Sequence, residues 1–372
     1  MQKMRCSLLL AGLVLAGCQS TPLAIPAPVA TPAPLVTPVP DARVIAIHEQ
    51  AVFADMHAHP SRFHRANVES ILAAEVEVYR RSSMDLVVAN ISSDMAWDGE
   101  YTNRDGTEVV KGQYKPAPGE AYALAADRLQ RLRKTAELGY AVLADTPGSV
   151  LEARQDGQLA IMPALEGADG LEGDINNLYR MHASGLRLVQ LMHFRNNELG
   201  HTQTWPYTPG GLTEFGRQVV IEANRLGLII DLAHANEETV SDVLELSTRP
   251  VIFSHGGVRA MTQHDRAVTD DQIRAISAAG GIIGIWPHGR HLKDVAEMVD
   301  YMEHVIGIGG IDHVGIGSDL RGVSRYVEGF GEEANFHAIA AEFLARGYSD
   351  TDVGKVMGGN FFRLWQAVTA DR

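Results

Sequence analysis

Short apolar runs recur along the chain, and polar stretches compatible with helix separate most of them. Residues 227–234 (GLIIDLAH) and 250–255 (PVIFSH) show the pattern most clearly, because each run ends in histidine and a polar stretch lies between them. Continuous Leu/Ile/Val runs of this length are typical of parallel strands that are buried on both faces. Such runs predict eight strands, at 52–55, 85–91, 159–167, 186–193, 227–234, 250–255, 281–286 and 313–319.

Helical periodicity occupies most of the intervals between these runs. The sequence predicts helices at 68–81, 120–140 and 213–226, from about 270, and at 291–306. A chain of 372 residues, 45% of them hydrophobic, has room for one large barrel or two smaller domains. The strand count and the alternation with helices favour one α/β domain, a (β/α)₈ TIM-type barrel over residues 43–372.

Two polar stretches stand out within this alternation of strands and helices. Residues 92–118 form a long irregular segment, which we predict to be a lid or pocket wall because loops of this length are usually functional. Within the predicted helix at 120–140, residues 128–134 (RLQRLRK) are basic, and we expect them to form a solvated helix face.

Side chains capable of chemistry stand where six of the predicted strands end. Each one alone has an ordinary explanation, such as a core histidine bonded to backbone or an exposed loop acid. In a (β/α)₈ barrel, however, the carboxyl ends of the strands meet at one rim, where active sites lie. We therefore predict that these residues come together: His57, His59, Glu166, His193, His234, His255 and Asp319.

These residue types suit a metal centre. His57 and His59 are two positions apart in an extended segment, so their imidazoles point to the same side. Imidazoles and carboxylates without cysteine suit Zn²⁺ or a related ion, and four or more histidines suggest two ions bridged by Glu166. A water between such ions becomes a nucleophile near neutral pH, and Asp319 is placed to accept its proton and pass it to a leaving amine. The sequence thus predicts hydrolysis of an amide or ester.

The N-terminus has the features of an exported lipoprotein. Lys3 and Arg5 precede the apolar stretch 8–17, and residues 15–18 (LAGC) resemble the bacterial lipobox, in which cleavage precedes an acylated cysteine. We expect a signal peptide at 1–17, lipidation of Cys18 and a Pro/Ala-rich tether at 18–42, on the periplasmic side in a Gram-negative cell. An ordinary signal peptide with an incidental cysteine is the alternative. Because cleavage would leave one cysteine, no disulfide is expected.

Charge limits the partners. The formal net charge is −14, and apart from the short basic stretch 128–134 the chain has no lysine- or arginine-rich run. This argues against nucleic acid or anionic lipid as the main partner.

The segment from about residue 53 to 365 resembles the membrane dipeptidase (renal dipeptidase) family of the amidohydrolase superfamily. The similar segments are DMHAHP (55–60), ALEG (164–167), LMH (191–193), DLAH (231–234), FSH (253–255), HDR (264–266), GIGSD (315–319) and GGNF (358–361). The resemblance implies a barrel with two zinc ions, often in a homodimer, and cleavage of dipeptides with tolerance of a D-residue at the C-terminal side.

The resemblance also implies roles for individual residues. His57, His59 and Glu166 would hold one zinc ion, and Glu166, His234 and His255 the other. His193 would polarise the scissile carbonyl, and Asp319 would be the general acid and base. Arg266 would pair with the C-terminal carboxylate of the substrate, a task suited to a guanidinium group.

Two positions depart from the family pattern. His59 stands where the family usually has aspartate, so the site loses one negative charge, which affects retention of one ion or the choice of metal. Arg321 stands where the family tends to carry an acid, and beside the substrate it would favour an acidic substrate or reject a free amino terminus. The main hypothesis is a zinc-dependent dipeptidase-like amidohydrolase. The alternatives are a relative acting on another amide, such as a peptidic metabolite, and a catalytically silent binding lipoprotein.

Overall fold

The computed structural model describes residues 41–62, 68–92, 94, 99–102, 109–112, 116–204 and 207–370, all within one compact unit, Pro38–Arg372. The expected signal peptide, Cys18 and nearly all of the tether lie outside the described residues, as does much of the segment 92–118. Among the helices that are described, none combines the length and apolar character needed to cross a bilayer.

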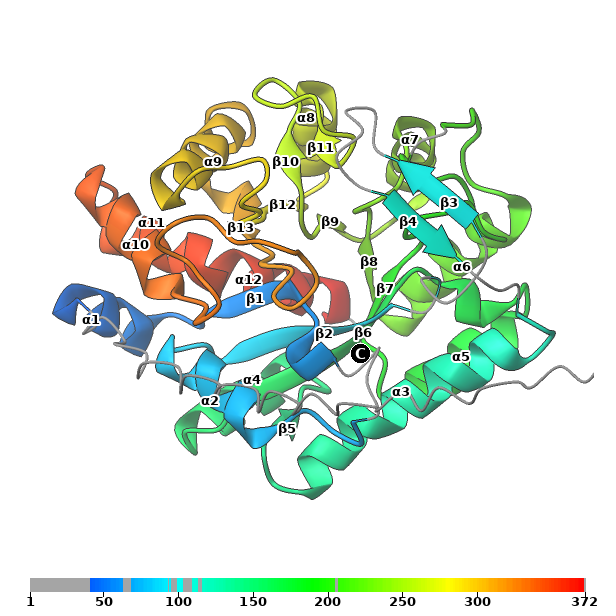
Figure 1. Cartoon of the computed structure of the whole chain (residues 1–372), viewed down its shortest axis with the longest axis horizontal. Helices are drawn as coiled ribbons and strands as arrows, with labels where there is room; N and C mark the ends of the chain where they lie inside the picture. The colour runs from blue at the N-terminus through cyan, green and yellow to red at the C-terminus, as the bar shows by residue number, and fades with distance from the viewer. Residues whose placement is uncertain are drawn as a thin grey trace, which may run out of the picture. The chain divides into compact units, whose positions relative to one another are not determined.

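Eight parallel strands form a nearly closed barrel, and each contains part of one predicted run (Figure 1). In spatial order they are β1 (Ala54–Ala58), β2 (Leu86–Ser92), β6 (Ala160–Glu166), β7 (Leu188–Gln190), β8 (Ile229–Asp231), β9 (Ile252–Phe253), β12 (Ile282–Ile285) and β13 (Val314–Ile316). A parallel bridge between Ala58 and Leu320 brings the ends together, with His59 N donating to Leu320 O at 2.8 Å. The predicted (β/α)₈ fold is confirmed.

The smaller strands lie outside this order. β5 (Val142–Leu143) pairs with β6, and β10 (Gly257–Val258) pairs with β11 (Ala267–Val268). β3 (Gly99–Thr102) and β4 (Val109–Gly112) form an antiparallel pair. The segment 92–118, predicted to be irregular, therefore contains a two-stranded sheet.

Helices surround the barrel (Figure 1). They are α1 (Ala42–Gln50), α2 (Ala73–Arg81), α3 (Glu120–Glu137), α4 (Pro147–Gln155), α5 (Ile175–Ala183), α6 (Glu214–Leu226), α7 (Glu237–Leu246), α8 (Asp270–Ala278), α9 (Val295–Gly309), α10 (Phe336–Ala345), α11 (Asp350–Gly354) and α12 (Asn360–Thr369). Single turns of 3₁₀-helix occur at Pro60–Arg62, Asp169–Leu171 and Ile311–His313, and a π-helical turn, Lys355–Gly359, joins α11 to α12.

Side-chain caps explain where several helices begin. Thr213 accepts from Gly216 N at the start of α6, as predicted, and Thr269 forms a capping box at the start of α8. Asp294 caps α9, so that helix begins four residues later than the predicted 291. Helix α2 also begins later than predicted. Ile71 N donates to Thr135 Oγ1 and Leu72 N donates to Ser61 Oγ, so neither group donates to a backbone carbonyl of a helix.

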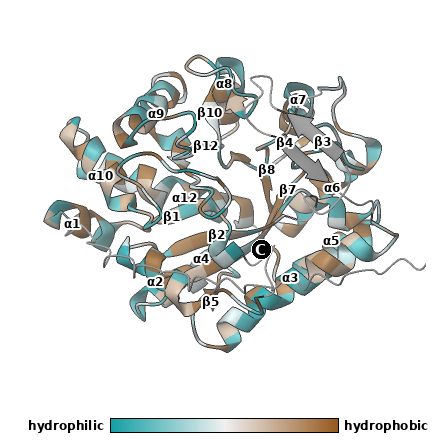
Figure 2. Ribbon diagram, viewed as in Figure 1, coloured by the Kyte–Doolittle hydropathy of each residue, from teal (hydrophilic) through white to brown (hydrophobic). Residues whose placement is uncertain are grey.

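Apolar residues cover both faces of the strands, which explains their continuous apolar runs. On β2, Leu86 and Val88 belong to a buried cluster that includes Trp365 of α12. The alternate residues Val87 and Ala89 belong to a second cluster, which includes residues of the surrounding helices. Figure 2 shows the resulting hydrophobic strands within more mixed helices. The strand ends are thereby held at fixed positions on the rim.

Candidate metal centre

Glu166, the last residue of β6, is buried among all five predicted imidazoles. Its Oε2 lies 3.2 Å from His59 Nε2. The distances from its Oε1 are 3.2 Å to His57 Nε2, 3.4 Å to His193 Nε2, 3.4 Å to His234 Nε2 and 3.7 Å to His255 Nε2. Residues from five strand ends, scattered over 199 positions of sequence between His57 and His255, thus converge on one carboxylate. The structure brings the predicted ligand set together.

Three sets of side chains have ligand atoms within 4.8 Å of one another. They are His57, His59 and Glu166; Glu166, His193 and His234; and His57, Asp231 and His255. The first set is the one that the family resemblance implies for one ion. In the second set His193 takes the place that the resemblance gives to His255. The partition of the histidines between two ions stays a prediction.

The donor set fits a divalent ion such as zinc. The Nε2 atoms of His57 and His234 are buried, and within the described part of the chain neither makes a hydrogen bond of suitable geometry, although Glu166 Oε1 lies 3.2 and 3.4 Å from them. Buried polar atoms normally have partners, since an unpaired one costs ~1–3 kcal/mol. An ion held by imidazole nitrogens and Glu166 oxygens would satisfy them, and zinc is among the ions that bind such ligands.

Neighbouring charges set the protonation states of the site. Burial raises the pKa of Glu166, but the imidazoles of His193, His57 and His59 outweigh it and hold that pKa well below its usual value. Burial, with the nearby charges of Arg266 and other histidines, lowers the pKa of both His234 and His255. These two imidazoles are therefore neutral, the state that binds metal.

His59 behaves differently because two carboxylates face it. Burial lowers its pKa, but Glu166 and Asp319, whose Oδ1 lies 3.2 Å from His59 Nε2, raise it to about 10. Without an ion, His59 is therefore an imidazolium at neutral pH. It must lose its Nε2 proton before that nitrogen can bind an ion.

This protonation state predicts that ion binding releases a proton. Because the pKa of His59 is about 10 in the folded protein, zinc affinity should rise about tenfold per pH unit as the pH increases towards 10. By the same shift, His59 stabilises the ion-free protein fully below pH 6.5, and this stabilisation is lost as the pH rises towards 10. Calorimetric zinc titrations in buffers of different ionisation enthalpy measure the protons released, and a count of zero would contradict the prediction.

Asp319 lies beside His57 and His59 at the rim. It follows β13 in a left-handed backbone conformation, φ 48°, and its backbone N donates to His57 O at 2.8 Å. Its Oδ1 lies 3.9 Å from His57 Nε2 in addition to the contact with His59. Non-glycine residues in this conformation cost energy and cluster at functional sites, and here the turn directs the carboxylate at the imidazoles.

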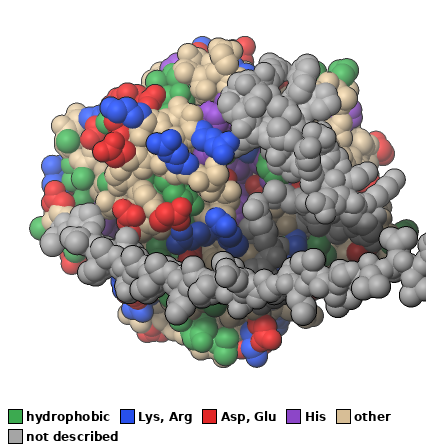
Figure 3. Space-filling view, viewed as in Figure 1, with side chains coloured by type: hydrophobic (Ala, Val, Ile, Leu, Met, Phe, Trp, Pro, Cys, Tyr) green, Lys and Arg blue, Asp and Glu red, His purple; other side chains and the backbone are tan. Residues whose placement is uncertain are grey.

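Arg266 is buried beside the imidazoles, where His255, Trp286 and Gln203 contact its guanidinium group. Its Nη2 lies 2.9 Å from His255 Nε2 and donates to His255 O at 3.2 Å. Its guanidinium carbon lies 5.0 Å from the centre of the Trp286 ring, a cation–π distance. With the Gln203 amide in its better-satisfied orientation, Gln203 Oε1 accepts from Arg266 Nε at 2.9 Å. Figure 3 shows histidine side chains beside arginine and lysine side chains on the face that is drawn.

Asp94, which follows β2, is a site residue that the sequence pattern did not predict. Its Oδ1 lies 2.6 Å from His193 Nδ1, and its Oδ2 accepts from Phe194 N at 2.9 Å. Burial lowers the pKa of His193, but Asp94 and Glu166 outweigh it and raise that pKa. The polar tip of the predicted strand 85–91 was the available signal. That signal is weak, because the residues after the strand lack strong periodicity and fall within the predicted irregular segment.

The basic stretch 128–134 does not form a fully solvated helix face, contrary to the prediction. Arg128 is buried and donates to Ser92 O, at the end of β2, at 2.6 Å, whereas Arg133 and Lys134 are exposed as expected. Burial lowers the pKa of Arg128 to about 10. This arginine is therefore an internal anchor of the rim and does not belong to a solvated face.

Arg321 is engaged by two carboxylates. Its Nε donates to Glu75 Oε1 of α2 at 2.9 Å, and its Nη1 donates to Glu332. Its charge is thus paired within the protein. The expectation that Arg321 selects an acidic substrate or rejects an amino terminus is not supported by this arrangement.

Comparisons with known proteins find a matching family model and similar dipeptidases. A family model described as membrane dipeptidase, peptidase family M19, matches residues 43–372. Dipeptidase verJ of Clonostachys rogersoniana is 34% identical over 235 residues, 61% of this chain and 60% of that protein, so the chain spans less than two thirds of this relative.

Solved structures show the same fold. Dipeptidase AC, a metallopeptidase of family M19, is 26% identical with a TM-score of 0.71, over 85% of this chain and 98% of that chain. The probable dipeptidase PvdM of Pseudomonas aeruginosa is 20% identical with a TM-score of 0.74, over 88% and 98% of the two chains. Since the family model spans nearly all of the described residues, the chain belongs to the membrane dipeptidase family, peptidase family M19.

Proposed function

We propose that the protein is a zinc-dependent dipeptidase-like amidohydrolase that cleaves a dipeptide or similar small amide. The observation that carries the proposal is the convergence of five imidazoles on Glu166, with Asp319 Oδ1 3.2 Å from one of them. His57, His59, Glu166, His234 and His255 would hold the ions, with Glu166 as the bridge. When bound, such ions polarise a carbonyl and lower the pKa of water to near neutrality.

The chain's own residues would bind the substrate and move its protons. Arg266, fixed by Trp286 and Gln203, would pair with the C-terminal carboxylate of the substrate. His193 would donate from Nε2 to the scissile carbonyl oxygen, while Asp94 accepts from its Nδ1. Asp319 would take the proton of the attacking water and deliver it to the leaving amine.

We further propose that the protein is exported and anchored by a lipid to a bacterial membrane. Cleavage before Cys18, acylation of that cysteine and a tether over 18–42 would hold the barrel near a bacterial membrane, on the periplasmic side in a Gram-negative cell. The support is the sequence pattern of residues 1–40. Metabolic labelling with a fatty acid tests it, because Cys18→Ala should abolish incorporation. The family also suggests a homodimer, which sedimentation of the purified protein tests.

A dipeptide panel tests the activity. Purified protein loaded with zinc is expected to hydrolyse dipeptides, including ones with a D-residue at the C-terminal side, and a chelator should abolish the activity. Amidated dipeptides, which lack the carboxylate proposed for Arg266, are the matched controls and should react with a higher KM. Zinc binding without turnover of any dipeptide would favour a different amide substrate, the alternative suggested by His59. Failure to bind zinc at all would favour a catalytically silent binding protein.

A further inference from the structure

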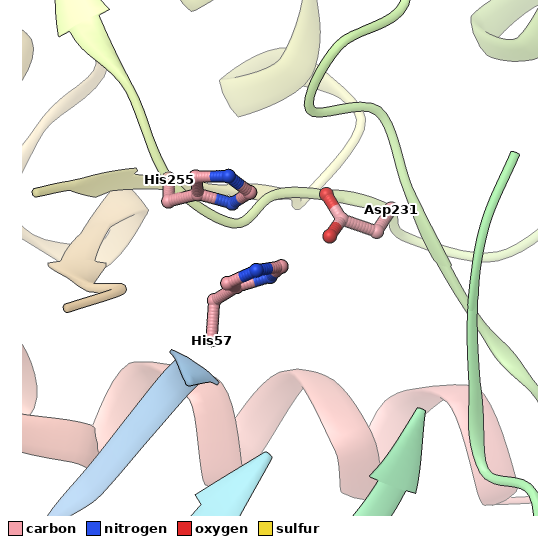
Figure 4. Close-up of side chains that lie close together, drawn as sticks. All are labelled: His57, Asp231 and His255. Carbon is pink, nitrogen blue, oxygen red and sulfur yellow. The ribbon is translucent and has the colours of Figure 1, made fainter. Parts of the chain in front are cut away.

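Asp231, a buried carboxylate with no role in the proposed reaction, lies beside two of the imidazoles. It is the last residue of β8 and is fully buried. Figure 4 shows its carboxylate facing the rings of His57 and His255. One oxygen of Asp231 and one nitrogen of each ring lie within 4.8 Å of one another.

The two oxygens of Asp231 have different surroundings. Oδ1 accepts from Ala233 N at 3.0 Å and from Ser254 N at 2.9 Å. Oδ2 is buried and has no hydrogen-bond partner among the residues that the structure describes. Burying a carboxylate oxygen in this way is costly unless a positive or hydrogen-bearing group faces it. The imidazoles of His57 and His255 are the groups nearby.

Ser254 links the carboxylate to the same two rings. Its Oγ lies 2.8 Å from His255 Nδ1 and 3.4 Å from His57 Nδ1, and the ring centres are 3.7 Å apart. The opposite ring nitrogens, both Nε2, point towards Glu166. The two imidazoles therefore share one arrangement, with Nδ1 towards Ser254 and Nε2 towards the ion positions.

This arrangement matters because only a nitrogen without hydrogen can bind an ion. A histidine that binds through Nε2 carries its hydrogen on Nδ1, and a carboxylate near that edge fixes the tautomer and the ring orientation. We propose that Asp231 is a positioning residue shared by His57 and His255, acting on both directly and through Ser254. Since the two histidines are assigned to different ions, this one carboxylate would tune both ion positions. The inference rests on the proposed metal centre.

Asp55 provides a matched control for the removal of a buried charge. It is also fully buried, on β1, two residues before His57. Its Oδ1 accepts from Ser318 N at 2.8 Å and His57 N at 3.2 Å, and its Oδ2 accepts from Ser318 Oγ. Both of its oxygens are thus occupied by donors other than imidazole nitrogens. Asp55→Asn therefore removes an equally buried carboxylate that is not grouped with the imidazole nitrogens.

The test compares zinc affinities by competition with a chromophoric chelator. Asp231→Asn is expected to weaken binding of both ions by about 10–100-fold, with the same number bound at saturation, because outer carboxylates contribute on this scale. Asp55→Asn is expected to stay within about threefold of the wild type, and turnover by Asp231→Asn should recover at saturating zinc. Circular dichroism of the ion-free proteins checks the fold. If Asp231→Asn does not fold, Ser254→Ala carries the same expectation for both ions.

Each other outcome has a defined meaning. Unchanged affinity in Asp231→Asn, or an equal loss in Asp55→Asn, overturns the shared positioning role. Loss of one ion at saturating zinc, with the other bound at wild-type strength, also overturns it and makes Asp231 a direct ligand. A wild-type protein that binds no zinc contradicts the proposed metal centre itself, so the two failures are distinguishable.

Discussion

Asp319→Asn is expected to lower kcat by about three orders of magnitude while the zinc content stays at the wild-type level, because general acid–base catalysis typically contributes 10²–10⁴-fold. The amide has the same shape as the carboxylate but cannot accept the proton of the attacking water. Zinc binding should not weaken, since Asp319 raises the pKa of His59, and its removal makes His59 easier to deprotonate.

The measurement combines kcat with zinc content from elemental analysis of the same sample. Glu75→Gln is a useful companion, because Glu75 pairs with Arg321, two residues after Asp319, and does not take part in the proposed proton transfer. Turnover by Asp319→Asn equal to that of the wild type would refute the acid–base role. Loss of zinc from this variant would instead place Asp319 among the ligands.

The sequence predicted the barrel and the gathering of the rim residues for one physical reason. Parallel strands buried on both faces require continuous apolar runs, and the carboxyl ends of such strands meet at one edge. Glu166, His234 and Asp319 could therefore be placed at the same rim without knowledge of any contact. The apolar runs did not predict where helices begin and end. Helix α9 begins where the Asp294 side chain caps it, and hydrophobic periodicity carries no information about such a cap.

The supporting carboxylates were harder to predict because their roles depend on distances between strands. Asp231 was part of a recognised motif, but its relation to His57, 174 positions away in sequence, exists only in the closed barrel. Asp94 lay at the start of a segment without strong periodicity. Arg321 was expected to face the substrate because of its position in the sequence. In the structure its guanidinium group donates to Glu75 of α2 and to Glu332, two contacts that the sequence did not predict.

His234→Ala is expected to remove zinc and reduce turnover to the level of a blank. His234 Nε2 lies 3.4 Å from Glu166 Oε1, in one ligand set with His193, and its neutral state suits ion binding. Loss of His234 should strongly weaken binding of the ion proposed for Glu166, His234 and His255. Because Glu166 would contact both ions, binding of the ion proposed for His57 and His59 should also weaken. Zinc per chain after dialysis against a weak chelator, together with kcat, measures both effects.

The backbone at His234 makes the choice of variants important. His234 has φ 69°, in the left-handed region, where alanine costs about 1–2 kcal/mol and asparagine is better tolerated. His234→Asn should therefore lose zinc as His234→Ala does but keep a higher melting temperature in the ion-free state. His304→Ala, on α9, controls for removal of a histidine away from the rim and should retain zinc and activity. Full zinc retention by His234→Asn would show that this imidazole is not a ligand, and would leave His57, His59, Glu166 and His255 to hold the ions.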